Sequence, residues 1–361
     1  MPEVEKGEKK MKIAVAMSGG IDSTVAAILL KKEGHEVIGL TAKMHSRASN
    51  LLIESQQIAD KLNIPHYTLD LTENFANEVI KPFCHKYLQG QTPNPCVICN
   101  ARVKFKDLWA YALSLGCDKL ATGHYVKIKV SEEGRFYLCR GRDKLKDQSY
   151  FLGLLPQKIL SHLLFPLGDY TKSEIRDLSL FYNLSLNNKP ESQEICFIPG
   201  NNYSAFIENY LKKEALPLPS SGEVIDLKGN ILGRHEGIHK YTIGQRRGLG
   251  ISADRPLYVI KIMAKKNIVI IGPEEDLEDR GLLVEDLNLM KSSSIKNFLK
   301  EKVWLKSRST QKSIEVKVSK SGNGLEVTFK GLAGITPGQL ALFYNQNQAV
   351  LAAGIIKKGY K

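Results

Sequence analysis

Over residues 11–125, the apolar positions fall into two alternating patterns. Residues 13–17 form an unbroken apolar run, which is typical of a buried parallel strand. The apolar positions between residues 25 and 30 fit a helix packed on a sheet. The alternation continues with strand-like stretches at 36–41, 65–69 and 119–122 and helix-like stretches at 51–62, 74–87 and 105–115. It predicts an α/β fold with a doubly wound parallel sheet, in which ligands bind beyond the carboxyl ends of the strands.

The pattern changes further along the chain. Residues 137–186 are mostly helical and polar in pattern, and Thr171 followed by Glu174 has the spacing of a capping box. A stretch rich in Pro, Ser and Gly at 216–222 marks a boundary or a long loop, and short strand-like runs follow it. Among these, the alternating runs beyond residue 281 predict a small antiparallel barrel. We therefore expect a disordered extension at 1–10, a first domain at 11–200, a small central domain at 201–275 and a C-terminal antiparallel β-barrel at 276–361.

The segment SGGIDS at residues 18–23 joins the first predicted strand to the first predicted helix. Its two glycines allow the backbone to approach a ligand closely, and the hydroxyl groups of Ser18 and Ser23 add hydrogen-bond donors. Such a turn points several N–H groups and a helix N-terminus at one spot, which suits a phosphate. It is not a Walker loop, because no Gly-Lys-Ser/Thr follows. The simpler alternative is a tight turn with a serine cap. Residues 121–125, ATGHY, also follow a strand and are expected to line the same cleft.

The composition favours a partner that is a polyanion. The chain has 361 residues, and 51 Lys and Arg against 38 Asp and Glu give a net charge of +13. A basic surface attracts phosphates and nucleic acids, although it can also serve only to keep a protein soluble. No apolar run reaches the ~20 residues of a membrane span, and the charged residues 1–10 lack the apolar core of a secretory signal. We expect a cytoplasmic protein with no membrane association.

Six cysteines require an explanation, because stable disulfides are uncommon in a reducing cytoplasm. Cys96 and Cys99 follow a proline-rich approach that is expected to hold them in a defined loop. At this spacing they can bind one metal ion, form a labile disulfide, or act as nucleophile and resolving thiol, and chance burial is the remaining alternative. Cys196 precedes a Pro-Gly turn, as expected for an accessible loop thiol, with a lone buried cysteine as the alternative. We predict that the others pack in the core: Cys84, Cys117 and Cys139.

Two further segments carry weaker signals. Residues 146–151, KDQSYF, combine polar groups with aromatic rings, and a helix start is their default interpretation. Residues 239–250, HKYTIGQRRGLG, contain glycines, arginines and a tyrosine, which suit a loop on a phosphate backbone or on stacked bases. A solvated hairpin is the equally reasonable alternative for the second segment.

Together and in this order, these segments resemble the tRNA-specific 2-thiouridylases, which are PP-loop ATP pyrophosphatases with a HUP-like domain. Enzymes of this family place sulfur on the wobble uridine of some tRNAs. The resemblance extends from about residue 11 to the C-terminus, whereas other PP-loop enzymes, such as the GMP and NAD synthetases, would share only the first motif. It rests on seven segments: AMSGGIDS, TPNPCVICN, ATGHY, KDQSYF, ESQEICFIPG, YTIGQRRGLGI and TPGQLALFY.

The resemblance implies roles for particular residues. Cys99 matches the family's nucleophile, and Cys196 matches the cysteine that carries a persulfide. The positions implied to bind ATP are Ala16, Met17, Ser18, Gly19, Gly20, Ile21, Asp22, Ser23, Ala42 and Gly123. The positions implied to contact tRNA, with the first three facing the target base, are Asn94, Pro95, Cys96, His124, Lys146, Asp147, Gln148, Arg308, Ser309 and Gln339.

The implied chemistry is coherent. The C2 oxygen of uracil is a poor leaving group, and adenylation by ATP lets it depart as AMP. A sulfur nucleophile then attacks C2. Mg²⁺ is expected to neutralise the departing pyrophosphate, with Asp22 as a candidate contact. A sulfur-relay protein or a cysteine desulfurase is the expected partner that supplies the sulfur.

Cys96 departs from the pattern of many relatives, which carry Asp at this position as a candidate acid–base group. Cys96, Cys99 and Cys196 could instead hold a [4Fe-4S] cluster with one open iron site, which would bind the transferred sulfide. The loop at 44–50 also looks shorter and less acidic than in many relatives. The sequence therefore leaves open a persulfide route and a cluster route.

Two other functions remain as alternatives. The first is a non-catalytic RNA-binding module with a structural zinc site at the cysteines, which would have no need of Asp22 and Ser23. The second is another PP-loop adenylating enzyme, such as a small-molecule amide synthetase, which would need neither the C-terminal barrel nor the basic surface.

Overall fold

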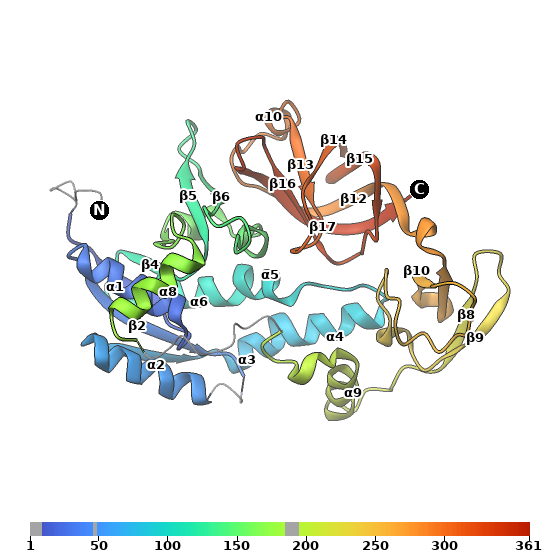
Figure 1. The fold of residues 1–361 in the computed structure, drawn as a ribbon, viewed down its shortest axis with the longest axis horizontal. Helices are drawn as coiled ribbons and strands as arrows, with labels where there is room; N and C mark the ends of the chain where they lie inside the picture. Colours follow the sequence, from blue (N-terminus) through green and yellow to red (C-terminus); the bar gives the residue numbers. More distant parts are fainter. Residues whose placement is uncertain (1–8, 46–48, 185–194) are drawn as a thin grey trace.

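The computed structural model describes residues 9–45, 49–184 and 195–361. A parallel sheet, a six-stranded barrel and a smaller sheet are arranged along the molecule, and helices α4 (Lys81–Leu88) and α5 (Pro95–Cys99) run beneath the barrel (Figure 1). The extension predicted at 1–10 falls mostly on residues 1–8, which lie outside the described residues. Within the described part of the chain, no helix is both long enough and apolar enough to cross a bilayer.

The first sheet confirms the doubly wound α/β prediction. Its five strands are all parallel and lie in the order β3-β2-β1-β4-β7. The strand order reverses at β1, so β1 and β4 flank the switch point at which α/β sheets bind ligands. The strand bounds are β1 (Lys12–Ala16), β2 (Glu36–Lys43), β3 (His66–Asp70), β4 (Lys119–Thr122) and β7 (Leu163–Leu164).

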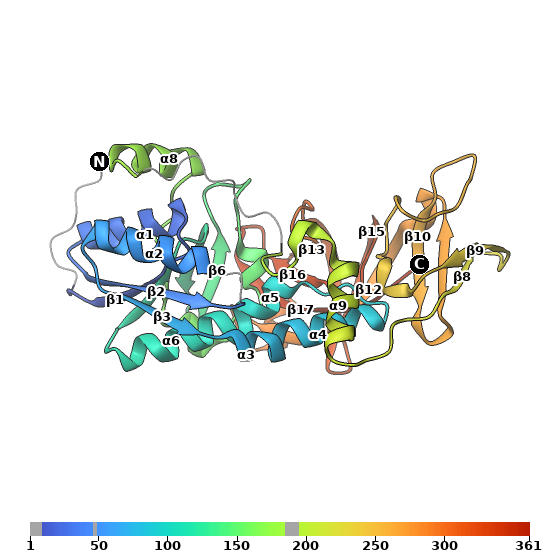
Figure 2. The same cartoon turned by 90° about the horizontal axis from the view of Figure 1, so that it is seen from below.

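Helices cover both faces of this sheet, as its apolar strands require. Ile13 and Val15 pack with α1 (Ile21–Lys32) and α2 (Ser49–Leu62), whereas Ala14 packs with α6 (Phe105–Ser114) on the other face. This arrangement follows from the alternation of side chains along a strand. Figure 2 shows α1 and α2 on one side of the strands and α6 on the other.

Two long helical stretches contain π-helical turns. The stretch predicted at 74–87 is helical, as α3 (Thr72–Phe75), a π-helical turn at Ala76–Ile80, and α4. Pro82 stands in the first turn of α4, where a missing N–H is tolerated. The second stretch is α5, a π-helical turn at Asn100–Lys104, and α6. The prediction that Cys96 and Cys99 lie in a loop is therefore wrong, because both belong to α5.

Residues 126–140 correct a second expectation. The pattern of 137–186 predicts mostly helix, but its first residues pair in an antiparallel hairpin of β5 (Val126–Val130) and β6 (Phe136–Arg140). Helices follow, as predicted, and the capping box of Thr171 and Glu174 is present at the start of α8. Residues 185–194 lie outside the described part. The remaining helices here are a 3-10 turn at Ser149–Leu152, α7 (Gln157–Leu160), α8 (Lys172–Phe181), a 3-10 turn at Pro199–Asn201 and α9 (Tyr203–Lys213).

The later strands form a small sheet and a closed barrel, as predicted. The central sheet has the order β10-β11-β8-β9, with β8 (Gly222–Ile225), β9 (Ile231–His235), β10 (Tyr258–Met263) and β11 (Ile268–Gly272). Helix α10 (Ile295–Phe298) follows the first barrel strand. The barrel strands, in chain order, are β12 (Glu278–Leu289), β13 (Val303–Lys306), β14 (Ile314–Ser321), β15 (Gly324–Ala333), β16 (Leu340–Tyr344) and β17 (Val350–Tyr360).

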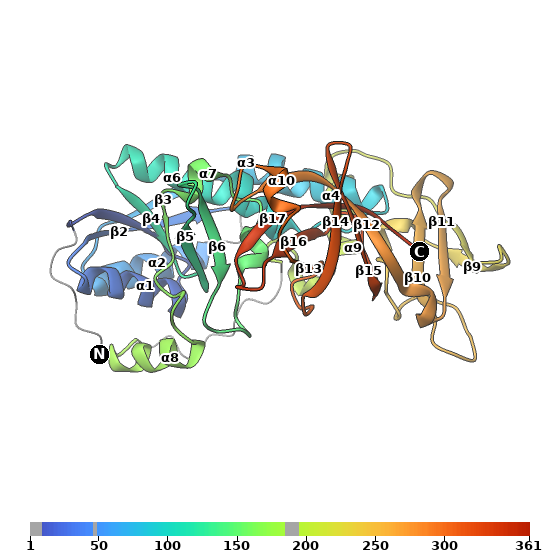
Figure 3. The ribbon, with the colours of Figure 1, turned by 90° about the horizontal axis from the view of Figure 1, so that it is seen from above.

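The barrel packs tightly on the first domain. Leu340, Leu342 and Tyr344 of β16 belong to the same buried apolar cluster as Phe105 of α6. An isolated antiparallel β-bridge between the backbones of Cys139 and Ala349 joins β6 to the barrel domain. Figure 3 shows β6 beside the barrel strands. The first domain and the barrel therefore share a core, which can transmit the position of one to the other.

Candidate active site

The SGGIDS turn has a geometry suited to phosphate. Gly19 has φ +64°, and the Ser18 N–H donates to Ser23 Oγ over 3.2 Å, which holds the turn closed. The residue that caps α1 is Gly20, and it makes no side-chain capping bond. Ser23 Oγ instead donates to the Gly20 carbonyl over 3.2 Å. The serine-cap alternative is therefore wrong, and the N-terminus of α1 keeps its capacity to bind an anion.

The ends of β1 and β4 meet at this turn. Ala16 pairs with Thr122, and a Cβ on Gly123 would lie 2.7 Å from both the carbonyl carbon of Asp22 and the nitrogen of Ser23. Only glycine permits so close an approach of two backbones. The structure thus brings Gly123 against residues 16–23, while Ala42 lies at the carboxyl end of the neighbouring strand β2.

A buried lysine that sequence reasoning missed is paired with Asp22. Lys172 Nζ lies 2.7 and 2.8 Å from the two carboxylate oxygens, and the Tyr125 hydroxyl donates to Oδ1 over 2.6 Å. Lys172 is only 7% exposed and occupies the first position of α8, directly after the capping residue Thr171. The capping box was the available signal, because it placed this lysine at a helix start, but the contact between α8 and α1 was not predictable from local pattern.

The three candidate sulfur residues converge on one region. The Asn94 carboxamide caps α5 by accepting from the N–H groups of Cys96 and Val97 over 3.2 and 3.3 Å. Cys99, on the same helix, packs against the apolar cluster that contains Phe197. Phe197 is 5% exposed, and its ring lies in edge contact with three others: Phe75, Phe83 and Phe206. This aromatic anchor, which sequence reasoning also missed, holds the exposed Cys196 beside α5.

Desolvation raises the pKa of all three thiols, so they are protonated at neutral pH. It raises the pKa of Cys99 to about 12 and the pKa of Cys96 to about 11, and nearby thiols add to both shifts. The pKa of Cys196 is also raised by partial desolvation of its sulfur, although the residue as a whole is exposed. The positive charge of Lys104 opposes the shift at each of the three, so this lysine faces all of them.

These shifts predict how alkylation of the free protein depends on pH. The thiolate is the reactive form, so the rate at Cys99 should keep rising by about tenfold per pH unit above pH 9, whereas an unperturbed thiol levels near its pKa of about 8.5. Lys104→Met should slow the reaction several-fold, because it removes the charge that favours the thiolate. The measurement is the iodoacetamide rate at each cysteine by mass spectrometry. Lys106→Met, which alters an exposed lysine two residues further on, is the control and should change nothing. A plateau below pH 9 would contradict the assignment.

The cysteines are not arranged as a metal site. Within the described ranges, no group of three His, Cys, Asp or Glu side chains is positioned to hold a metal ion. Cys96, Cys99 and Cys196 interact electrostatically but remain separate free thiols. As placed among the described residues, they do not fit a [4Fe-4S] cluster. Glu191–Glu194 of the segment ESQEICFIPG and residues 46–48 of the loop at 44–50 lie outside the described part.

Three tRNA candidates belong to the part of the first domain next to the carboxyl end of β4. His124 follows Gly123, and its ring lies 5.7 Å from that of Phe105, next to Lys104 in sequence. Burial, with a further effect from the charge of Lys104, keeps the His124 pKa well below its usual value, so the ring is neutral. The side chain of Gln148 accepts from the N–H of Tyr125 over 3.0 Å, and Lys146 beside it is half-buried.

The other tRNA candidates are engaged within the protein. The carboxylate of Asp147 is 4% exposed and accepts from Ser149 Oγ over 2.8 Å. Arg308 donates to Thr336 Oγ1 over 2.9 Å, and Gln339 donates to the Thr92 carbonyl over 2.7 Å. Ser309 and Asn94 are half-buried, and Pro95 is buried. The contacts of Asp147, Arg308 and Gln339 lie where the first domain, the central domain and the barrel meet.

Residues 239–250 form part of the central core. His239 is 1% exposed and Tyr241 is 7% exposed, so the solvated-hairpin alternative is wrong for this end of the segment. The two arginines, Arg246 and Arg247, are exposed and remain available to an anion.

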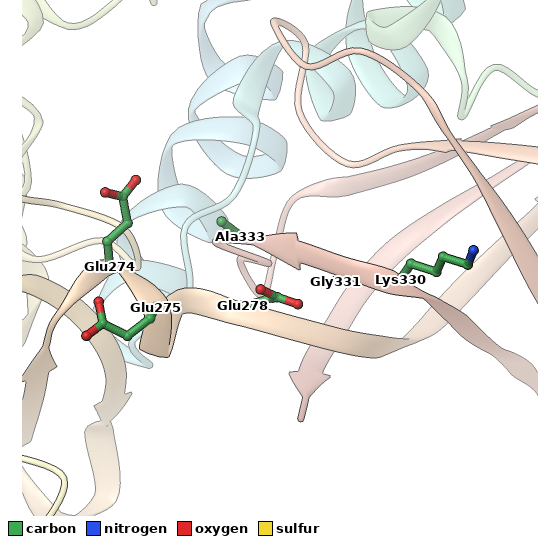
Figure 4. A pocket seen from close by; sticks show the side chains of 6 residues that line it. All are labelled: Glu274, Glu275, Glu278, Lys330, Gly331 and Ala333. Atoms are coloured by element: carbon green, nitrogen blue, oxygen red, sulfur yellow. The ribbon is translucent and has the colours of Figure 1, made fainter.

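A surface pocket elsewhere does not suit either substrate. It lies where the central sheet meets the barrel and is lined by three carboxylates, from Glu274, Glu275 and Glu278, together with Lys330 (Figure 4). Its predominantly acidic lining would repel phosphates.

Comparison with known proteins decides the family. Residues 11–200 match the tRNA methyl transferase HUP domain, residues 204–273 the tRNA methyl transferase PRC-barrel domain, and residues 279–356 the aminomethyltransferase beta-barrel domain. The chain is 44% identical to the tRNA-specific 2-thiouridylase MnmA 2 of Thermoanaerobacter pseudethanolicus, over 97% of this chain and 99% of that protein. The chain belongs to the tRNA-specific 2-thiouridylase family. The MnmA of Rickettsia peacockii is 42% identical over 98% of this chain and 99% of its own length. Members of the family from distant bacteria thus align with the whole three-part architecture.

Proposed function

We propose that this protein uses ATP to replace the C2 oxygen of a tRNA wobble uridine with sulfur. One observation carries the proposal: Cys99 and Cys196, far apart in sequence, converge around Lys104 beside the edge of the sheet that carries the ATP motif. His124 and Ala42 connect the proposed ATP site to the cysteines. His124 follows Gly123 and lies near Lys104, and Ala42 packs on the same apolar cluster as Cys99.

We assign three domains to the chain, at residues 11–200, 201–275 and 276–361.

Residues 16–23, Ala42 and Gly123 are proposed to hold ATP, with the N-terminus of α1 facing a phosphate. The carboxylate of Asp22 has the oxygen donors that Mg²⁺ prefers, and bound Mg²⁺ would neutralise pyrophosphate. In the free protein Lys172 neutralises this carboxylate. When ATP binds, we expect the Lys172 ammonium group to contribute positive charge beside the phosphates. The C2 oxygen of uridine attacks the α-phosphorus, pyrophosphate leaves, and the adenylated base is ready for substitution.

Sulfur then arrives as a persulfide on Cys196, supplied by a donor protein that can reach this exposed residue. In one order of steps, the terminal sulfur attacks C2 and AMP departs. The Cys99 thiolate then attacks Cys196 Sγ, which forms a Cys99–Cys196 disulfide and releases the thiocarbonyl. In the other order, Cys99 first frees hydrosulfide, which attacks C2. Both orders end with the same disulfide, which a thiol reductant must reduce before the next turnover. Cys96, whose pKa is about 11, enters as a neutral thiol and not as a base.

We propose that tRNA is held by the candidates near the domain junction, including His124, Lys146 and Gln148 of the first domain and Ser309 of the barrel. The net charge of +13 supports binding to a polyanion. We expect the reaction to take place in the cytoplasm, where both tRNA and reduced thiols are available.

The test is product analysis after incubation with tRNA, ATP, Mg²⁺ and a cysteine desulfurase with cysteine. We expect 2-thiouridine at the wobble position by nucleoside mass spectrometry, with one AMP and one pyrophosphate for each sulfur incorporated. An unmodified or methylated uridine, with a persulfide on Cys196 verified by mass, would overturn the proposal. Anaerobic purification with iron and sulfide analysis separates the two sulfur routes, since thiolation that requires stoichiometric iron would favour the cluster.

A further inference from the structure

Two hydrogen bonds from the barrel domain hold the backbone of Thr92, which lies shortly before α5, the helix that contains Cys96 and Cys99. The N–H of Thr92 donates to the carbonyl of Pro337 over 2.9 Å, and Gln339 Nε2 donates to the carbonyl of Thr92 over 2.7 Å. Residues 337–339 connect β15 to β16. Both backbone polar groups of Thr92 are thus held by this one barrel loop (Figure 1 shows the barrel above α5).

The segment between Thr92 and Cys96 is stiff. Pro93 and Pro95 have fixed φ angles, and each also restricts the residue before it. Asn94, between them, is tied to the helix by its bonds to the N–H groups of Cys96 and Val97. Few torsions are therefore free to absorb a movement of Thr92, and its position sets the position at which α5 begins.

Other contacts hold the same helix in register with the barrel. Asn100 Nδ2 donates to the carbonyl of Phe151 over 3.1 Å, just beyond Cys99. The neighbouring Tyr150 is fully buried, and its hydroxyl lies 3.1 Å from the carbonyl of Leu340 and 3.5 Å from Gln339 Oε1. The segments TPNPC, KDQSYF and TPGQL, distant in sequence, meet at this point.

We propose that the barrel loop 337–339 is a positioning element for Cys96 and Cys99, acting through Thr92. Gln339 is then a positioning residue, because its side-chain amide holds Thr92 and touches neither thiol. Gly338 makes the close contact possible: its φ is +92°, and a Cβ would lie 3.2 Å from Pro93 N and from the carbonyl carbon of Thr92. The inference rests on the proposed function for its purpose, but the contact it describes exists without tRNA or ATP.

The decisive comparison is Gly338→Ala against Gly322→Ala. Both glycines lie in barrel turns with positive φ, but a Cβ on Gly322 would meet nothing within 4 Å. Both variants therefore carry backbone strain, and only the first pushes on Thr92. In the free protein, we expect Gly338→Ala to raise the iodoacetamide rates of Cys96 and Cys99 several-fold relative to Cys196, and Gly322→Ala to leave this ratio as in the wild type. In the thiolation assay, kcat should fall by roughly tenfold to a hundredfold with an unchanged KM for tRNA.

Equal alkylation ratios in the two variants would overturn the inference, as would a rise in KM for tRNA with no change in kcat. If Gly338→Ala does not fold, as judged by circular dichroism, Gln339→Ala replaces it. That variant removes the bond to Thr92 without adding atoms and should shift the alkylation ratio in the same direction. The alkylation comparison needs no substrate, so it decides the positioning role even if the wild-type protein fails to thiolate tRNA and the proposed function is rejected.

Discussion

Replacement of Cys99 by serine is expected to lower tRNA thiolation by roughly 10⁴-fold or more, because the variant loses the thiol that releases sulfur from Cys196. ATP binding should survive, since Cys99 lies on α5 and not in the SGGIDS turn. Without tRNA, the Cys196 persulfide should still form and then persist, because the Cys99 thiol no longer resolves it. Cys196→Ser should be equally inactive with a protein donor but should accumulate no persulfide. The measurements are 2-thiouridine by nucleoside mass spectrometry and persulfide by mass spectrometry of the intact protein.

Cys139→Ala is the matched control for both variants. Cys139 is 8% exposed and lies on β6, and the charges that act on its thiol are those of Lys127, Lys129 and Lys291, not that of Lys104. It should keep the wild-type rate. If Cys99→Ser retained more than a tenth of the wild-type thiolation, the assignment of Cys99 would be wrong. In the absence of tRNA, a persulfide that failed to persist on Cys196 in this variant would argue against a transfer between the two cysteines.

The second large effect concerns Lys172, the buried partner of Asp22. Lys172→Met should lower kcat/KM for ATP by about 10²-fold, because it removes a preorganised positive charge that would pair with phosphate as charge develops. Asp22→Asn should have an effect in the same direction by removing the candidate Mg²⁺ contact. The measurements are the initial rate of AMP formation at varied ATP and the ATP affinity by calorimetry.

Lys291→Met provides a matched loss of an ion pair. Lys291 lies in the segment between β12 and α10, 3.0 Å from Glu301, and this variant should leave the ATP parameters unchanged. An unchanged KM and kcat for ATP in Lys172→Met would show that the lysine only neutralises Asp22 and never contacts the nucleotide.

Local patterns were sufficient to predict the strand–turn–helix around the SGGIDS segment and most of the sheet. Residues 13–17 and 18–23 combine an apolar run, two glycines and a following helix, and each of these signals acts within a few residues. The barrel was predictable from alternation along short strands for the same reason. The α5 helix was missed because Pro93 and Pro95 suggested a loop, although proline at the first helical position after an Asn cap is a helix start.

The rest of the site depends on contacts between distant segments. Nothing near Phe197 in sequence indicates that its ring packs on Phe75 and Phe83, yet that packing brings Cys196 to α5. The ion pair of Lys172 with Asp22 and the hydrogen bond from Gln339 to Thr92 likewise form only when helices and domains pack together. The motif order pointed to a family, whereas the geometry that aligns the thiols came from tertiary structure.

The central claim is that ATP turns the C2 oxygen of uridine into the oxygen of a departing AMP. The most direct test uses an anticodon stem-loop with ¹⁸O at C2 of the target uridine, incubated with the enzyme, ATP and the sulfur donor. Mass spectrometry of the AMP is the readout. The account predicts one ¹⁸O atom in AMP for each 2-thiouridine formed. Thiolation accompanied by unlabelled AMP, with the ¹⁸O in water or pyrophosphate, would contradict it.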